Sequence, residues 1–365
     1  MGSDGVGGEN GGVAVIDELE LRHRVDLRLE VGPRRGARRA NRTRSEARAR
    51  PVGDEIVGRR ADDRDVNALE LGRVLGVRKR PERQQPRVVG LLAVPAPALE
   101  RVDHAPQSYD RSVTRNSEDI LTDAPPPAAN ARLAYGPEPK QFGDLRLPDV
   151  DRLWPLAVVV HGGSWKAMYN LIHTGHLCVA FARAGIATWN VEYRSVGDVD
   201  GVWPSGGDDV AAAVEFSARL AERYPLDEQR VVLVGHSAGG QLALWAAKRA
   251  QLPVVALAPV SDMRESARRV GPEGAVARFL GGMPDDASAR YAEASPLELL
   301  PLGVDQILVH GTADEDVPYE MSERYVDDAG GEATLVKLDD AGHFEPIDPS
   351  AAEFERALAA VRSLL

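Results

Sequence analysis

Residues 231–247 read VVLVGHSAGGQLALWAA, and this stretch decides the fold. Its first four residues are apolar and predict a buried strand that ends at Gly235, whereas the residues from Ala238 onward predict a helix. Ser237 stands in the turn between them, with Gly235 and Gly239 two positions to either side. A turn this tight brings those two positions together, so only glycine fits there. The alternative interpretation is a serine that merely caps a helix.

The segments around this stretch alternate between strand-like and helix-like patterns. Near-continuous apolar strands separated by amphipathic helices are typical of a mostly parallel sheet with helices on both faces. In such an α/β fold, functional groups lie at the C-terminal ends of the strands. The expected strands are residues 131–136, 141–148, 153–163, 186–194, 230–235, 253–260, 306–311 and 333–340, and the expected helices are residues 171–185, 208–225, 238–250, 317–330 and 349–365.

The first 115 residues differ in composition from the rest of the chain. They contain 22 Arg, 1 Lys and 18 acidic residues, a net charge of +5, and Tyr109 is their only aromatic residue. Such a segment cannot easily bury enough apolar surface to offset its ordering entropy. We expect residues 1–118 to be disordered, or to be a non-native extension upstream of a true start near Val113. Residues 119–365 should form one domain.

The composition also argues against several classes of partner. Residues 116–365 contain 21 basic and 38 acidic residues, a net charge of −17, which disfavours binding to nucleic acid or to an anionic membrane. No apolar run approaches the roughly 18 residues of a membrane span, and the N-terminus lacks a signal-peptide pattern. Cys178 is the only cysteine, in keeping with a cytoplasmic location. We therefore expect a small-molecule substrate, and the sequence leaves the oligomeric state open.

Another strand end carries glycines that could serve acyl chemistry beside Ser237. The motif HGGSW at residues 161–165 follows the strand expected at 153–163. Acyl transfer needs two N–H donors aimed at the oxyanion. We expect one donor to be the amide of Ala238, which follows the serine, and the other to come from Gly162 or Gly163.

The last two strand ends supply a base and a carboxylate. His343 follows the strand at 333–340, and a serine nucleophile needs such a base. The base in turn needs a carboxylate that fixes its tautomer. Asp314, Glu315 and Asp316, after the strand at 306–311, all offer one.

The other histidines of the domain have simpler interpretations. His161 is expected to position its loop, His236 to be the variable residue of the turn, and His310 to be packed at a strand end. His173 and His176 share a helix face, but the neighbouring cysteine does not lie on it. We therefore expect no metal site and no cofactor.

These motifs together resemble the α/β-hydrolase superfamily, and within it the esterase/lipase-like group that includes kynurenine formamidases and hormone-sensitive-lipase-like carboxylesterases. The resemblance spans about residues 132–365 and includes HGGSW, NVEYR, VLVGHSAGGQLALWA and ILVHGTADEDVP. It implies an α/β-hydrolase fold with Ser237 as nucleophile and His343 as base. The family pattern H-G-x-x-D-x-x-V-P selects Asp314 among the three carboxylates. Ser164 departs from the lipase motif, which has a glycine there.

Substrate choice is expected to depend on the segment between two strands near the C-terminus. Residues 263–304 are the expected short helical cap, and caps and loops of this kind set specificity. Trp165, Trp203 and Phe344 are candidates for the walls of the substrate pocket, with core packing as the alternative for each.

The sequence thus predicts a serine hydrolase that cleaves a small carboxylic ester through Ser237, His343 and Asp314 by way of an acyl-enzyme. An arylformamidase acting on an amide of the N-formylkynurenine type is the first alternative, and an exopeptidase is the second. A catalytically silent binding protein with the same fold is the non-enzymatic alternative.

Overall fold

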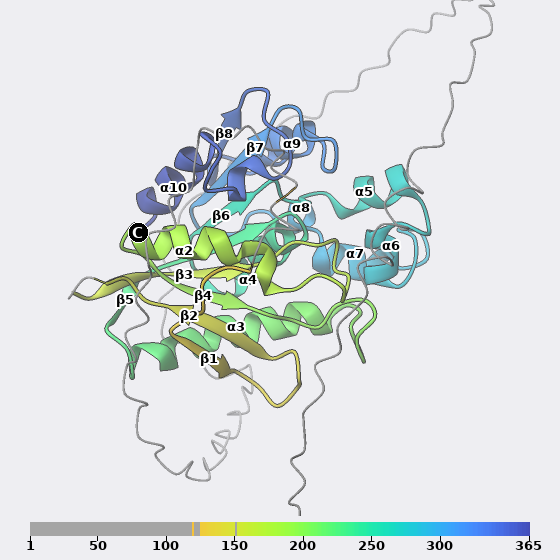
Figure 1. Cartoon of the computed structure of the whole chain (residues 1–365). Coiled ribbons are helices and arrows are strands. Elements are labelled where there is room, and N and C mark those ends of the chain that lie inside the picture. The colour runs from red at the N-terminus through yellow and green to blue at the C-terminus, as the bar shows by residue number, and fades with distance from the viewer. Residues whose placement is uncertain (1–118, 120–124, 150–151) are drawn as a thin grey trace, which may run out of the picture. The chain divides into compact units, whose positions relative to one another are not determined.

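The computed structural model describes residues 119, 125–149 and 152–365 (Figure 1). The expectation for residues 1–118 concerns residues outside this part of the chain and stays a prediction. None of the helices in the described part is long and apolar enough to cross a membrane.

A single eight-stranded sheet organises the described residues, in the order β1-β2-β4-β3-β5-β6-β7-β8. In this order the strands from β4 onward pair in parallel, whereas β1 pairs antiparallel with β2, and β2 pairs antiparallel with β4. This confirms the predicted mostly parallel sheet. The strands are β1 (Ala131–Ala134), β2 (Phe142–Arg146), β3 (Trp154–Val160), β4 (Ala187–Val191), β5 (Leu226–His236), β6 (Val254–Leu257), β7 (Gln306–Gly311) and β8 (Ala333–Leu338).

Helices cover both faces of the sheet. Side chains of α3, α4 and α9 pack in the hydrophobic cluster on one face, and those of α2 and α10 pack in the cluster on the other. The main helices are α2 (Gly175–Arg183), α3 (Ser205–Ala221), α4 (Ala238–Ala250), α9 (Tyr319–Asp328) and α10 (Phe354–Ser363).

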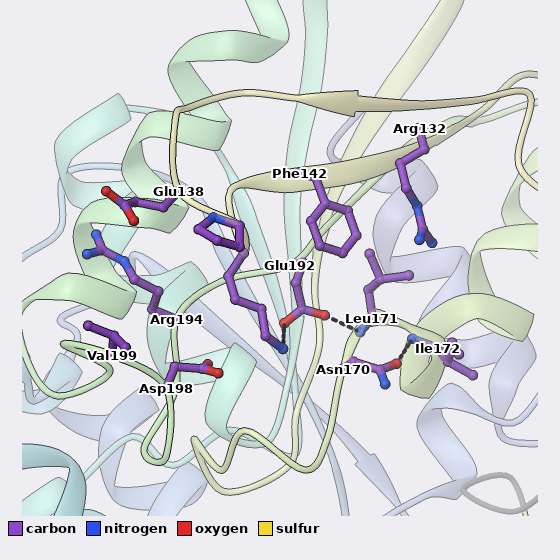
Figure 2. Close-up of a pocket in the computed structure, with 12 residues that line it drawn as sticks. Arg132, Glu138, Phe142, Asn170, Leu171, Ile172, Glu192, Arg194, Asp198 and Val199 are labelled. Carbon is purple, nitrogen blue, oxygen red and sulfur yellow. Dashed lines mark hydrogen bonds and ion pairs between the residues drawn. The ribbon is translucent and has the colours of Figure 1, made fainter. Parts of the chain in front are cut away.

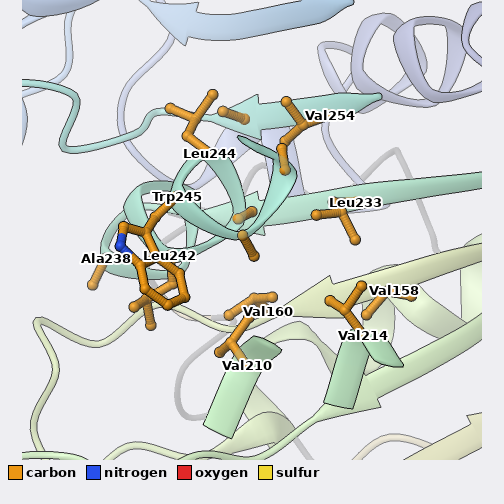
Figure 3. Close-up of a cluster of buried hydrophobic side chains, with 14 of the residues drawn as sticks. Val158, Val160, Val210, Val214, Leu233, Ala238, Leu242, Leu244, Trp245 and Val254 are labelled. Carbon is orange, nitrogen blue, oxygen red and sulfur yellow. The ribbon is translucent and has the colours of Figure 1, made fainter. Parts of the chain in front are cut away.

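Strand β3 shows why the central strands read as continuous apolar runs. Leu156, Val158 and Val160 belong to the first cluster, whereas Ala157 and Val159 belong to the second. Successive side chains of a strand point to opposite faces, so a strand covered on both faces must be apolar throughout. Figure 3 shows the first cluster, where side chains of β3, α3, β5, α4 and β6 meet.

Four short helices lie between β6 and β7, where the cap was expected. Asp262 caps the first of them, because its side chain accepts a hydrogen bond from the Glu265 amide. The four helices are α5 (Met263–Val270), α6 (Ala275–Leu280), α7 (Ser288–Ala294) and α8 (Pro296–Leu299).

Several segments differ from the sequence-based expectation at their ends; α10, for example, begins at Phe354, five residues after the expected start at 349. The helix expected at residues 171–185 is a 3₁₀ turn, η3 (Leu171–Thr174), followed by α2. Strand β5 begins at Leu226, four residues before the expected start, because Trp154 and Leu226 also pair across an irregularity in the ladder.

Candidate active site

Ser237 lies at the sharp turn between β5 and α4. Its backbone is in the left-handed region, with φ 56° and ψ −119°, which is a strained conformation for a residue with a side chain. A Cβ on Gly235 would stand 2.2 Å from the carbonyl oxygen of Gly239, and a Cβ on Gly239 would stand 2.3 Å from that of His161. The two glycines therefore allow α4 to pack directly against β5 and the end of β3.

The amides of Ala238 and Gly163 have no acceptor among the hydrogen bonds of the described residues. Ala238 is the first residue of α4, where amides have no partner within the helix. Gly163 has φ +109°, and a Cβ there would stand 2.4 Å from Tyr169 Cβ. A Cβ on Gly162 would crowd the backbone oxygen of His236 at 2.9 Å, so this loop packs closely on the turn.

His343 and Asp314 form a buried pair. His343 Nδ1 donates to Asp314 Oδ2 at 2.7 Å, and the Asp314 side chain is fully buried. The other carboxylate oxygen accepts from the amides of Asp316 and Val317 at 2.9 and 2.8 Å. His310 Nε2 is a further donor to Oδ2, at 3.1 Å. The Asp314 carboxylate thus has a donor on every side.

These donors determine the charge of Asp314. Burial by itself would raise the pKa of this carboxyl, but the hydrogen bonds from His310 and His343 outweigh it and hold the pKa well below its usual range. Asp314 is therefore ionised at neutral pH. The neighbouring side chains of Glu315 and Asp316 are exposed to solvent.

The turn of Ser237 and the residue His343 lie next to each other. The ring centroids of His236 and His343 are 4.7 Å apart, and His236 Nε2 donates to the His343 carbonyl oxygen at 2.9 Å. The hydrogen bonds of the described residues do not include one between the Ser237 hydroxyl and the His343 ring. Such contacts often tighten only when substrate binds.

The loop that carries Gly162 and Gly163 is held by a buried carboxylate. Glu192, which follows β4, accepts from the Leu171 amide at 3.1 Å and lies 3.4 Å from His161 Nε2. Burial opposes ionisation of Glu192, but the hydrogen bond with His161 leads the interactions that lower its pKa. The His161 ring also stacks on Tyr193 with centroids 4.4 Å apart. These contacts fit the expectation that His161 positions its loop.

The three candidates for pocket walls lie in different surroundings. Trp165 is 2% exposed, stacks on Phe279 of α6 and donates to Gln241 Oε1 at 3.1 Å. Trp203 is also buried and packs edge-on against Phe279. Phe344 is half-buried beside the rings of His236 and His343. Trp165 and Trp203 thus belong to the hydrophobic core, where they pack against α6.

A cavity of about 490 Å³ opens at the end of β4 (Figure 2). The β1–β2 hairpin and the loops after β3 and β4 line it, and Ser237, Asp314 and His343 do not. Glu192 contributes to this cavity while its carboxylate holds the loop of Gly162. The cavity therefore adjoins the loop of Gly162 and Gly163 rather than Ser237 itself.

No group of three or more His, Cys, Asp or Glu side chains among the described residues is arranged to hold a metal ion. His173 is instead hydrogen-bonded to another histidine, with its Nε2 2.8 Å from His236 Nδ1. Burial raises the pKa of the Cys178 thiol to about 12, which makes this thiol inert at neutral pH.

Sequence reasoning missed several residues that hold the site. Glu192 lies within the motif NVEYR, yet nothing in its spacing reveals a partner 21 residues away. Gln241 was read only as part of a helix, although its side chain links Trp165 to the Ala294 carbonyl. His236 is expected to be the variable residue of the turn, yet it is hydrogen-bonded to His343. His310 is expected to be packed at a strand end, and its ring is also hydrogen-bonded to Asp314.

Comparison with known proteins places this geometry in context. The BD-FAE family model matches residues 144–253, and that of the prolyl oligopeptidase family matches residues 203–355. No curated protein matches the chain.

Solved structures with the same fold include a truncated carbohydrate esterase from gut microbiota, with 20% identity and a TM-score of 0.56 over 64% of this chain and 94% of that one. Esterase B from Lactobacillus rhamnosis, inhibited by a tributyrin phosphonate, has 19% identity and a TM-score of 0.55 over 68% and 89% of the two chains. A thermophilic esterase from Thermogutta terrifontis, with butyrate bound, has 19% identity and a TM-score of 0.53 over 65% and 93%.

The sheet order and the strained serine turn thus define an α/β-hydrolase fold, as predicted. Over the matched residues the chain is similar to the BD-FAE and prolyl oligopeptidase families, and its fold is shared with the esterases named above.

Proposed function

We propose that the chain is a serine hydrolase that cleaves small carboxylic esters, with Ser237 as nucleophile, His343 as base and Asp314 as its orienting carboxylate. The observation that carries this proposal is the 2.7 Å hydrogen bond from His343 Nδ1 to a buried Asp314, packed against the strained turn of Ser237. The esterases among the structural neighbours and the BD-FAE match support an ester as the substrate.

The hydrogen bond to Asp314 determines which nitrogen of His343 acts as the base. Because Nδ1 carries the proton that Asp314 accepts, Nε2 keeps a lone pair and can remove the proton from the Ser237 hydroxyl. The serine oxygen then attacks the ester carbonyl carbon and forms a tetrahedral intermediate. The ionised Asp314 stabilises the imidazolium that results.

The negative charge of the intermediate falls on the former carbonyl oxygen. The amide of Ala238 and that of Gly162 or Gly163 are suited to bind it, since none of the three donates another hydrogen bond in the described part of the chain. His343 then protonates the departing alcohol, which leaves an acyl-enzyme on Ser237. Water deprotonated by His343 attacks the acyl carbonyl. The bond between the acyl carbon and the Ser237 oxygen then breaks, His343 returns the proton to that oxygen, and the carboxylic acid is released.

Initial rates on p-nitrophenyl acetate, p-nitrophenyl butyrate, N-formylkynurenine and an aminoacyl p-nitroanilide would test this assignment. We expect the esters to be cleaved with the highest kcat/KM, and Ser237→Ala to abolish their turnover. A preference for N-formylkynurenine would indicate the arylformamidase alternative. A preference for the anilide would indicate the exopeptidase that the prolyl oligopeptidase match suggests.

The binding-protein alternative makes a different prediction. A silent member of the fold would bind an ester without turnover and would not react with a fluorophosphonate. Burst release of p-nitrophenol in proportion to enzyme concentration would exclude it, because the burst reports an acyl-enzyme.

A further inference from the structure

Two buried histidines outside the proposed catalytic residues form a chain that ends on the base. His173 Nε2 lies 2.8 Å from His236 Nδ1, and His236 Nε2 lies 2.9 Å from the backbone oxygen of His343. His173 comes from η3, His236 from the last position of β5, and His343 from the loop after β8. The chain therefore joins three segments that are far apart in the sequence.

The partners of these rings fix their tautomers. A carbonyl oxygen can only accept, so His236 must carry a proton on Nε2. Burial lowers the pKa of His236 to about 3, so the ring is neutral and its Nδ1 is an acceptor. His173 must then donate from Nε2, which leaves its Nδ1 as a buried acceptor without a partner. The hydrogen bonds run in one direction, from His173 through His236 to His343.

The same pair also touches the oxyanion loop. A Cβ on Gly162 would stand 3.0 Å from His236 Nδ1 and 3.1 Å from His173 Nε2, so the loop backbone rests on both rings. Phe344 packs beside them, with ring centroids 5.7 Å from His236 and 6.2 Å from His173. The pair is thus in contact with the oxyanion loop, the serine turn and the base loop at once.

From this geometry we infer that His173 and His236 are positioning residues, which fix the backbone of His343 relative to Ser237 and thereby place the base for proton transfer. This inference rests on the proposed function, because it needs His343 to act as base. Neither ring has to contact substrate. The positioning depends on one hydrogen bond, which the Nε2–H of His236 donates to the His343 carbonyl oxygen.

The test replaces that N–H while keeping the bulk of the ring. His236→Phe removes the donor, whereas His236→Gln can restore an N–H near the position of Nε2. The readout is kcat on p-nitrophenyl acetate per active site titrated with a fluorophosphonate. In His236→Phe we expect this kcat to fall about 10- to 100-fold, because small displacements of a catalytic group cost this much. KM should stay within about twofold of the wild-type value. His236→Gln should recover most of the loss.

Titration of active sites separates loss of positioning from loss of folding. A variant that is partly unfolded has fewer titratable sites but a normal kcat at each of them, whereas loss of positioning lowers kcat at every titrated site. If His236→Phe does not fold, His173→Leu and His173→Gln take its place. The first removes the donor to His236, and the second keeps one. His176→Phe, three residues further on in α2, is the matched control and should keep its kcat per site.

The inference is wrong if His236→Phe, or His173→Leu in its place, keeps kcat per titrated site within about twofold of the wild type. It is also wrong if the Gln variants are as impaired as the apolar ones. Failure of the proposed function would look different, because Ser237→Ala would then keep its activity whatever the histidine variants do.

Discussion

Replacement of Asp314 by Asn tests the role of the buried carboxylate. The four groups around this side chain are all donors: the rings of His343 and His310 and the amides of Asp316 and Val317. A carboxylate accepts on both sides, whereas a carboxamide accepts on one side only. Either orientation of Asn therefore points an NH₂ group at donors.

The expected loss follows from the tautomer of the base. When the NH₂ group faces His343, Nδ1 must become the acceptor and the proton moves to Nε2, so the base cannot take the serine proton. A wrong tautomer of this kind costs about 10⁴-fold in kcat. That factor corresponds to about 5 kcal/mol in the activation barrier.

The assay is kcat on p-nitrophenyl acetate for Asp314→Asn beside Asp316→Asn and Glu315→Gln. The last two side chains are exposed, so we expect their variants to stay within about twofold of the wild type. The reasoning would be refuted if Asp314→Asn kept more than about a tenth of the wild-type kcat, or if Asp316→Asn lost as much.

Three further outcomes follow from the structure. Gly235→Ala places a Cβ 2.2 Å from the Gly239 carbonyl oxygen, so we expect a loss of at least about 1–3 kcal/mol in urea unfolding, and an unchanged midpoint would contradict the steric argument. Glu192→Ala leaves the Leu171 amide without its acceptor, which should cost about 1–3 kcal/mol in the free energy of unfolding. The melting temperature and kcat should therefore both be lower than in the wild type, and unchanged values would show that Glu192 does not hold the loop. Burial lowers the pKa of His236 in the folded chain to about 3, whereas in the unfolded chain it is about 6.5. Between these two pH values only the unfolded chain binds the proton. The free energy of unfolding therefore falls as the pH falls from about 6.5 towards 3. Urea midpoints at pH 7 and pH 5 should therefore differ less in His236→Phe than in the wild type, and an equal difference would mean that His236 is not buried and neutral.

The fold could be predicted because its determinants are local. The apolar run of β3 and the glycines around Ser237 each act within a few residues of the chain. Strand and helix alternation then specified the parallel sheet, and the C-terminal ends of its strands indicated His343. The extension of β5 to Leu226 was missed because it depends on pairing with Trp154, which no local pattern reveals.

The supporting contacts of the site could not be predicted, since they join residues distant in sequence. The spacing alone leaves three carboxylates open, and only the family resemblance selects Asp314 among them. In the folded chain the side chain of Asp314 is buried, whereas Glu315 is exposed. His236 occupies the variable position of the motif, and its bond to His343 spans 107 residues. Such contacts arise from packing of the loops at the strand ends.

Reaction with a fluorophosphonate probe, followed by peptide mass analysis, tests the central claim most directly. The account predicts one covalent label per chain on Ser237, and no label in Ser237→Ala, whose ester turnover should fall by at least about 10⁴-fold. A label on another residue, or labelling and turnover that persist in Ser237→Ala, would contradict it.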